Sequence, residues 1–456
     1  MPVREPAELL IEARWLLPVA PANCALADHA VALAGGRILA VGPASELRER
    51  FEPRERIRRE HHVLLPGLVN AHTSACHTLL RGLPVRGPRR RWLAECLAPV
   101  EARCLSADFV RDGTRLGIAE MLRAGITCFA DLSLYPEEAA RTAAAAHMRA
   151  VIGLPVADGP TPWADSATAH LARAARVWDE YRSDARIGLY FAPLTRHGVS
   201  EATLLRVRRV ADELDARVSV HLGELADFGS PAHPHEYARS APAQSGTPEL
   251  AGVADSAGSG CGSLQQLHAL QLLRPGFTAI GPGACARAEL DLAARQGVSF
   301  ICCPQADLRL GAGAPLCPPP PAVSGLGTDS PLAAGALDML AELRVAALVF
   351  GISAAEALRM ATLGGATALG VAAEIGSLEA GKAADLTCID LGALASQPGS
   401  AIHDALAFAT HRGQVSDVWC AGRLAVSAGR PLSFDEAELA MLPQHWAGRL
   451  NLEAAA

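Results

Sequence analysis

From residue 64 to about residue 360, short apolar runs alternate with segments in which apolar residues recur every three to four positions, as in an amphipathic helix. Parallel strands that are buried on both faces read as continuous apolar runs, and each needs a crossover, usually a helix, before the next strand begins. Eight runs of this kind lie at residues 64–72, 126–131, 150–154, 187–192, 217–222, 277–281, 298–302 and 323–329. Eight strand and helix pairs predict a closed (β/α)8 barrel of the TIM type.

Residues that begin and end helices support this pattern. Ser106 is expected to cap a helix that ends near Gly125, where a glycine suits the carboxyl end. Ser353 and Glu356 form a capping box ahead of another apolar segment. The segments between the apolar runs are therefore predicted to be the barrel helices.

The two ends of the chain show a different pattern. Residues 1–63 alternate apolar and polar side chains, and residues 375–435 do likewise, which predicts short strands. We expect both ends to build one small composite β-sandwich domain beside the barrel. The predicted division is residues 1–63 for the first part of the sandwich, 64–374 for the barrel, and 375–456 for the second part and a tail.

One long loop is expected between the fifth and sixth strands. Residues 225–263 are rich in Ala, Ser, Gly, Pro and His and have little periodicity. Loops that follow the carboxyl ends of barrel strands surround the mouth of the barrel. We therefore expect this loop to lie over the mouth.

Charge and hydropathy exclude several classes of protein. The net charge is -7, and the arginines between residues 81 and 91 are interrupted by apolar residues and prolines, so we interpret that segment as a solvated loop. No run approaches the roughly 18 to 20 apolar residues that span a bilayer, and the first residues lack a signal-peptide core. We expect a cytoplasmic protein with no nucleic-acid or membrane partner.

Three predicted strands end in side chains that can bind a metal. They are His72 on the first strand, His221 on the fifth and Asp329 on the eighth. The carboxyl ends of barrel strands meet at one mouth, and TIM-barrel enzymes have their active sites there. Glu224 follows His221 by three residues, and a carboxylate there is able to carry a proton between water and a ring nitrogen.

Several motifs occur in the order typical of one family. They lie at residues 65–73, 79–82, 119–125, 218–224, 327–329 and 374–386. With these motifs the chain resembles the amidohydrolase superfamily, and within it the TRZ/ATZ and 5-methylthioadenosine/S-adenosylhomocysteine deaminase branch. The resemblance implies a barrel with a flanking β-sandwich, one divalent metal, and hydrolysis of a C–N bond, not a peptide bond, in a nucleoside or other heterocycle. It implies that His72, His221 and Asp329 are metal ligands, that Asp329 is also the base for water, and that Glu224 is the proton shuttle.

The chain departs from the family pattern at two ligand positions. Ser74 stands where the second histidine of a His-x-His pair is expected, and Gly281 ends the sixth strand where the family has a histidine. We therefore expect a degenerate metal site, which binds zinc or iron with reduced affinity or binds no metal. Cys76 or His77 is close enough in sequence to replace Ser74 if the loop is shifted.

Three interpretations follow from these departures. The first is a deaminase-like hydrolase with an eroded metal centre and weak or altered activity. The second is a catalytically silent paralogue that binds a nucleoside-like ligand or a protein partner. The third is metal-free chemistry that uses Glu224, Asp329, His72 or a thiolate of Cys302 or Cys303. The resemblance implies a homodimer, and the second interpretation also allows a mixed oligomer with an active relative.

Overall fold

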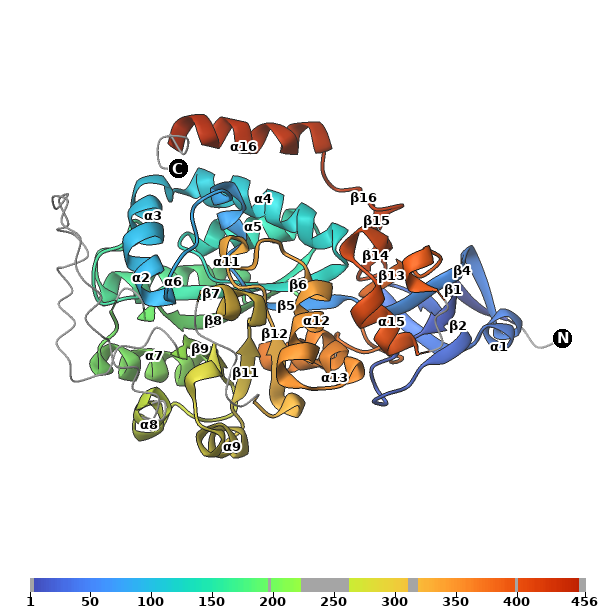
Figure 1. Cartoon of the computed structure of the whole chain (residues 1–456), viewed down its shortest axis with the longest axis horizontal. Coiled ribbons are helices and arrows are strands. Elements are labelled where there is room, and N and C mark those ends of the chain that lie inside the picture. The colour runs from blue at the N-terminus through green and yellow to red at the C-terminus, as the bar shows by residue number, and fades with distance from the viewer. Residues whose placement is uncertain (1–3, 196–197, 223–261, 311–318, 398–400, 451–456) are drawn as a thin grey trace.

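The computed structural model describes residues 4–195, 198–222, 262–310, 319–397 and 401–450. These residues form two eight-stranded sheets, one a nearly closed parallel barrel and the other a mixed sheet built from both ends of the chain (Figure 1). The predicted barrel with a composite β domain is thereby confirmed.

The barrel contains strands β5 to β12 in sequence order, all parallel where they pair. Their bounds are β5 (Leu68–Thr73), β6 (Ile126–Asp131), β7 (Arg149–Val156), β8 (Ile187–Pro193), β9 (Arg217–His221), β10 (Phe277–Ile280), β11 (Ser299–Cys302) and β12 (Ser324–Leu326). A single parallel bridge between Thr73 and Asp329 joins the first strand to the residues after the last one. The barrel therefore closes beside two of the predicted site positions.

The first apolar run, residues 64–72, is two strands and not one. Its beginning belongs to β4 (Phe51–Pro66) of the mixed sheet, and β5 starts only after Gly67. A Cβ atom on Gly67 would lie 2.0 Å from Oγ1 of Thr127, so only glycine lets the chain pass between the two sheets here. The run reads as continuous because the end of β4 and the whole of β5 are buried.

Helices cover the outside of the barrel (Figure 1). They include α4 (Ala107–Arg123), α5 (Pro136–Ala145), α6 (Ala167–Tyr181), α7 (Glu201–Leu214), α8 (Gly262–Ala269), α9 (Arg287–Arg295), α12 (Met339–Phe350) and α13 (Ala354–Arg359). The hydroxyl of Ser106 accepts a hydrogen bond from the amide of Phe109, and Ser353 forms its capping box with Glu356, which confirms both predicted helix starts. Among the described helices, none combines the length and the apolar composition that a membrane crossing requires.

The mixed sheet joins the two ends of the chain. Its order is β16-β15-β14-β13-β4-β1-β2-β3. Beside β4 its strands are β1 (Glu5–Leu16), β2 (Leu26–Ala34), β3 (Arg37–Pro43), β13 (Leu386–Asp390), β14 (Val415–Cys420), β15 (Arg423–Ser427) and β16 (Arg430–Pro431). Ile11, Leu64 and Trp419, which come from three different strands, lie in one buried cluster. Burial of these apolar side chains holds the amino-terminal and carboxyl-terminal strands together.

The segment after β5 is pressed against helix α4. The short helix η1 (Ala75–Leu80) follows β5, and a Cβ atom on Gly113 of α4 would lie 2.3 Å from the carbonyl oxygen of Cys76. On the other side of α4, the indole of Trp446 in α16 (Glu436–Leu450) donates to Asp112 at 3.1 Å. Helix α4 is thus held between α16 and η1, and η1 lies next to the barrel mouth, where His77 lines a cavity.

Candidate metal centre

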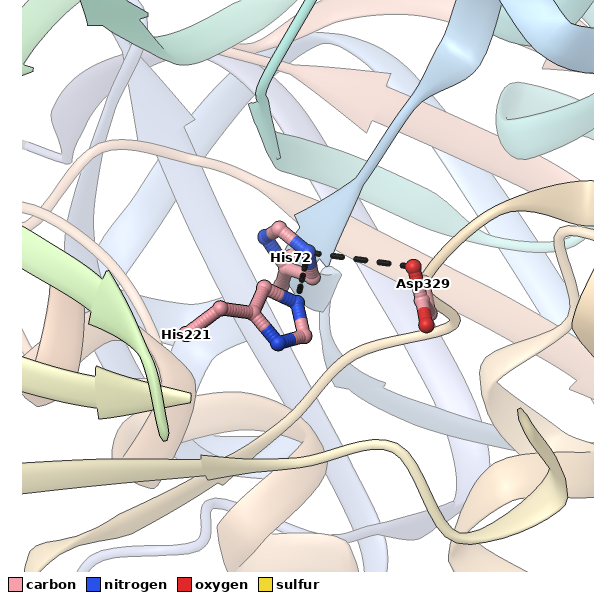
Figure 2. Close-up of side chains that lie close together, drawn as sticks. All are labelled: His72, His221 and Asp329. Carbon is pink, nitrogen blue, oxygen red and sulfur yellow. Dashed lines mark hydrogen bonds and ion pairs between the residues drawn. The ribbon is translucent and has the colours of Figure 1, made fainter. Parts of the chain in front are cut away.

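His72, His221 and Asp329 meet at the mouth of the barrel (Figure 2). His72 lies in β5, His221 ends β9, and Asp329 follows β12. The Nε2 atoms of the two imidazoles are 3.1 Å apart, and Nε2 of His72 lies 3.9 Å from Oδ1 of Asp329. All three residues are buried, and one ligand atom of each lies within 4.8 Å of the others. The structure therefore brings together the three metal-capable residues that the sequence predicted.

The Asp329 carboxylate is held in its charged form. Burial alone would raise its pKa, but the guanidinium of Arg89 and the neighbouring imidazoles of His221 and His72 lower that pKa well below the ordinary aspartate value. Oδ1 of Asp329 accepts a hydrogen bond from the amide of Ser330 at 2.7 Å. Asp329 itself has a φ of +55°, a left-handed conformation that few non-glycine residues adopt. The turn after β12 thus presents an ionised carboxylate to the imidazole pair.

The geometry of these donors fits a divalent ion. Two imidazole nitrogens bound tetrahedrally at about 2.0–2.1 Å from one zinc ion lie roughly 3.3 Å apart, close to the 3.1 Å found between His72 and His221. Three protein ligands with room for water are typical of catalytic zinc sites, and two histidines with one carboxylate also suit iron. His72, His221 and Asp329 are thus the residues that would hold the ion.

Arg89 also reaches this site, although no sequence pattern around it predicts a role there. It begins α2 (Arg89–Trp92), inside the segment that we interpreted as a solvated loop. Its guanidinium donates to Oδ2 of Asp329 at 2.5 Å and to Oδ1 of Asp307 at 3.1 Å. The Arg89 side chain is only 10% exposed, whereas that of Arg91 is 72% exposed. The prediction is therefore wrong for Arg89, because two distant carboxylates draw it into the mouth.

The two departures from the family pattern have different surroundings. The Ser74 hydroxyl donates to the carbonyl oxygen of Leu132 at 3.0 Å. Gly281 lies beside His221, since a Cβ atom there would be 3.7 Å from its Nδ1 atom. A longer side chain at position 281 would therefore extend near the imidazole pair, whereas the glycine has none.

Cys76 and His77 are both engaged elsewhere. The His77 ring lies 2.9 Å from Oε1 of Glu101 through Nε2 and 3.0 Å from the hydroxyl of Ser330 through Nδ1. Cys76 contacts the hydroxyl of Ser133 at 3.4 Å. Neither residue belongs to the group of possible ligands found among the described residues. His77 instead links α3 (Ala98–Cys104) to the residue that follows Asp329.

A small cavity opens onto these side chains. Its volume is about 40 Å³, and its lining includes His72, His221 and Asp329 together with Arg89, Trp92 and Leu194. The predicted proton shuttle Glu224 and nearly all of the predicted 225–263 loop lie outside the described residues. Their roles stay predictions.

Comparison with known proteins places the chain in a family. The model of the amidohydrolase family matches residues 63–425, which include the whole barrel and, of the mixed sheet, the end of β4, β13, β14 and part of β15. This chain belongs to the amidohydrolase family. It is similar to 5-methylthioadenosine/S-adenosylhomocysteine deaminases of Teredinibacter turnerae, at 34% identity over 97% of each chain, and of Saccharophagus degradans, at 30% over 99% of each.

Solved structures of other proteins agree with this amidohydrolase assignment. An adenosine deaminase from Xanthomonas campestris with bound zinc superposes with a TM-score of 0.88 at 36% identity, over 99% of this chain and 100% of the other. Atrazine chlorohydrolase from Arthrobacter aurescens, complexed with zinc, has a TM-score of 0.80 at 20% identity over 96% and 99% of the two chains. The second likeness establishes the fold alone.

Cys302 and Cys303 of this amidohydrolase are poor nucleophiles. Both are buried, and burial raises the pKa of each thiol far above its usual value. The nearby Asp307 carboxylate raises both further, and Asp329 also raises that of Cys303. A thiol in this environment stays protonated at neutral pH, which argues against the metal-free thiolate chemistry considered above.

Asp131 gives the amidohydrolase a testable pH dependence. It ends β6 and accepts the amide of Ala75 at 2.7 Å, and burial raises its pKa from 3.8 to about 6. Because the folded pKa is the higher one, this group contributes its full stability below pH 3.8, and that stability is lost as the pH rises through about 6. A shift of this size corresponds to about 3 kcal/mol.

We therefore expect Asp131→Asn to flatten this part of the stability profile, since asparagine keeps the carbonyl acceptor and stays neutral. The free energy of unfolding of the variant minus that of the parent should rise by about 3 kcal/mol between pH 4 and pH 7. Urea denaturation at a series of pH values measures this difference. A difference that is constant with pH would contradict the assignment to Asp131.

Proposed function

We propose that this amidohydrolase is a hydrolytic deaminase of adenine nucleosides, of the kind represented by adenosine, 5-methylthioadenosine and S-adenosylhomocysteine. The observation that carries the proposal is the buried group of His72, His221 and Asp329 at the barrel mouth. The proposal is also supported by relatives, because nearly the whole chain is similar to deaminases that are named for these substrates. In this reaction water adds to the ring carbon that bears the amino group, and ammonia leaves.

The residues of the site suit the proton transfers of this reaction. Asp329 is ionised and lies beside both imidazoles, so it is able to accept a proton from the attacking water. His72 and His221 would hold the divalent ion together with Asp329. Such an ion, when bound, supplies the Lewis acidity that makes water a nucleophile at neutral pH. We assign to Glu224, three residues after His221, the delivery of the proton to the ring nitrogen.

We further propose that turnover is slower than in relatives that have histidines at positions 74 and 281. Ser74 directs its hydroxyl to the carbonyl of Leu132, and Gly281 has no side chain to orient the nucleophile. One preorganised contact to the reacting group is often worth about a hundredfold in rate. The expected enzyme is therefore weak, with reduced affinity for zinc or iron.

The test is ammonia release by metal-loaded protein. Protein stripped with a chelator and reloaded with zinc or with iron(II) is incubated with each of the three nucleosides, and the stripped protein is assayed in parallel. We expect slow release that requires metal and differs between the nucleosides. Failure to release ammonia from any of them with either metal would overturn the proposal.

One observation favours a second function, that of a catalytically silent nucleoside-binding protein. Arg89 already provides a positive charge to Asp329, so the carboxylate is balanced by the chain itself. In this case adenosine would bind to the stripped protein with a measurable heat and no ammonia would be released with any metal. Calorimetry on the same stripped sample therefore separates the two functions.

A further inference from the structure

Arg89 places a cation on the carboxylate that a metal would use, at Oδ2, while Oδ1 is the oxygen that lies 3.9 Å from Nε2 of His72. Its guanidinium lies 2.5 Å from Oδ2 of Asp329, while Oδ1 of the same carboxylate accepts the amide of Ser330 at 2.7 Å. Both oxygens of Asp329 therefore already have donors. An ion that binds here must share a carboxylate oxygen with one of these donors or displace Arg89.

Arg89 is anchored from two sides. Besides Asp329 it contacts Asp307 at 3.1 Å, on α10 (Pro304–Arg309) after β11. The side chains of Asp307 and Asp329 are 15% and 10% exposed. A guanidinium removed from water in this way needs its carboxylates, because an unpaired buried charge is strongly unfavourable. Two anionic partners, held by different segments of the barrel, keep Arg89 at the metal centre.

A divalent ion and a guanidinium on one carboxylate repel each other. The ion would lie near Nε2 of His72 and His221, next to a carboxylate that Arg89 already neutralises. Like charges at short range in a buried site are screened poorly by solvent. Each cation therefore weakens the binding of the other to Asp329.

We propose that Arg89 is a tethered cation that competes with the divalent ion for Asp329 and lowers the metal affinity of this centre. This inference concerns the affinity of the site and holds whether or not the bound metal leads to deamination. The loss of a group that orients a metal ligand typically costs about ten- to a hundredfold in metal affinity, which sets the size of effect expected for a direct neighbour of a ligand. Here that neighbour is a cation, so its removal should tighten binding.

The test measures zinc affinity without any substrate. Chelator-stripped parent protein, Arg89→Met and the control Arg90→Met are titrated with zinc against a colorimetric zinc indicator. Arg90 is the exposed neighbour, so its replacement removes the same charge from the same helix at a site outside the mouth. We expect Arg89→Met to bind zinc about ten- to a hundredfold more tightly than the parent, and Arg90→Met to match the parent.

Thermal unfolding with and without zinc gives a second readout. Zinc should raise the melting temperature of Arg89→Met more than that of the parent, since stabilisation by a ligand grows with its affinity. Arg89→Gln, which is neutral and still able to donate to Asp329, takes the place of the methionine variant if that one does not fold. Equal or weaker zinc binding by the folded Arg89 variant would overturn the proposal. Tighter zinc binding without ammonia release would leave it standing and count against the deaminase.

Discussion

Asp329→Asn should reduce metal-dependent ammonia release by about a thousandfold, or to the background of the assay. Asparagine keeps an oxygen for the amide of Ser330 but loses the charge, and with it both the anionic ligand for the ion and the acceptor for the proton of water. When one residue of a catalytic unit is removed, the rate constant of turnover typically falls by three orders of magnitude or more. The measurement is the rate of ammonia release at saturating metal.

Asp307→Asn is the matched control for this prediction. Asp307 is the other carboxylate that contacts Arg89, and it is similarly buried, but it is not one of the possible ligands among the described residues. Its replacement should cost far less activity than Asp329→Asn. If both variants lose activity equally, the effect comes from the release of Arg89, and the proposed role of Asp329 as base is wrong.

Much of the barrel could be predicted because its strands are buried on both faces. The expected run 126–131 coincides with β6, and the other runs agree with their strands to within a few residues. The error at residues 64–72 has a physical cause. Hydrophobicity reports burial and does not tell which sheet a strand joins, so two strands separated by Gly67 appear as one.

The meeting of the three metal-capable residues could be predicted for a related reason. In a parallel barrel all strands end at the same mouth, so polar residues at the ends of β5, β9 and β12 must meet there. His72, His221 and Asp329 do so. No tertiary information beyond the order of the strands was needed.

Arg89 could not be found in this way. It lies in residues 84–91, a mostly exposed segment with two prolines and four arginines. Its partners Asp307 and Asp329 are 218 and 240 residues away in sequence. Nothing local distinguishes it from Arg90. The one available indication was indirect: Asp307 and Asp329 both follow barrel strands, and two carboxylates at one mouth need a positive charge nearby.

Asp385→Asn should destabilise the protein by about 3–5 kcal/mol, because it leaves the guanidinium of Arg149 buried without its carboxylate. Arg149 lies in β7 of the barrel with its side chain 8% exposed, and its Nε atom is 3.5 Å from Oδ2 of Asp385. Asp385 precedes β13 of the mixed sheet and accepts the amide of Ala421 at 2.7 Å. The pair therefore connects the two sheets, and asparagine keeps the bond to Ala421 while removing the charge.

Arg149→Met should reduce the free energy of unfolding less than Asp385→Asn does. The aspartate left behind by Arg149→Met is able to become neutral by taking up a proton, whereas the arginine left behind by Asp385→Asn stays charged. Burial already raises the pKa of Asp385, against the opposing effect of Arg149, so without Arg149 the carboxyl group takes up a proton more readily. The double variant should then be more stable than the sum of the two single losses predicts, by about 1–3 kcal/mol. Urea unfolding of the parent, the two single variants and the double variant at pH 7 measures this difference as a double-mutant cycle. Additive losses would show that the buried pair does not couple the barrel to the mixed sheet.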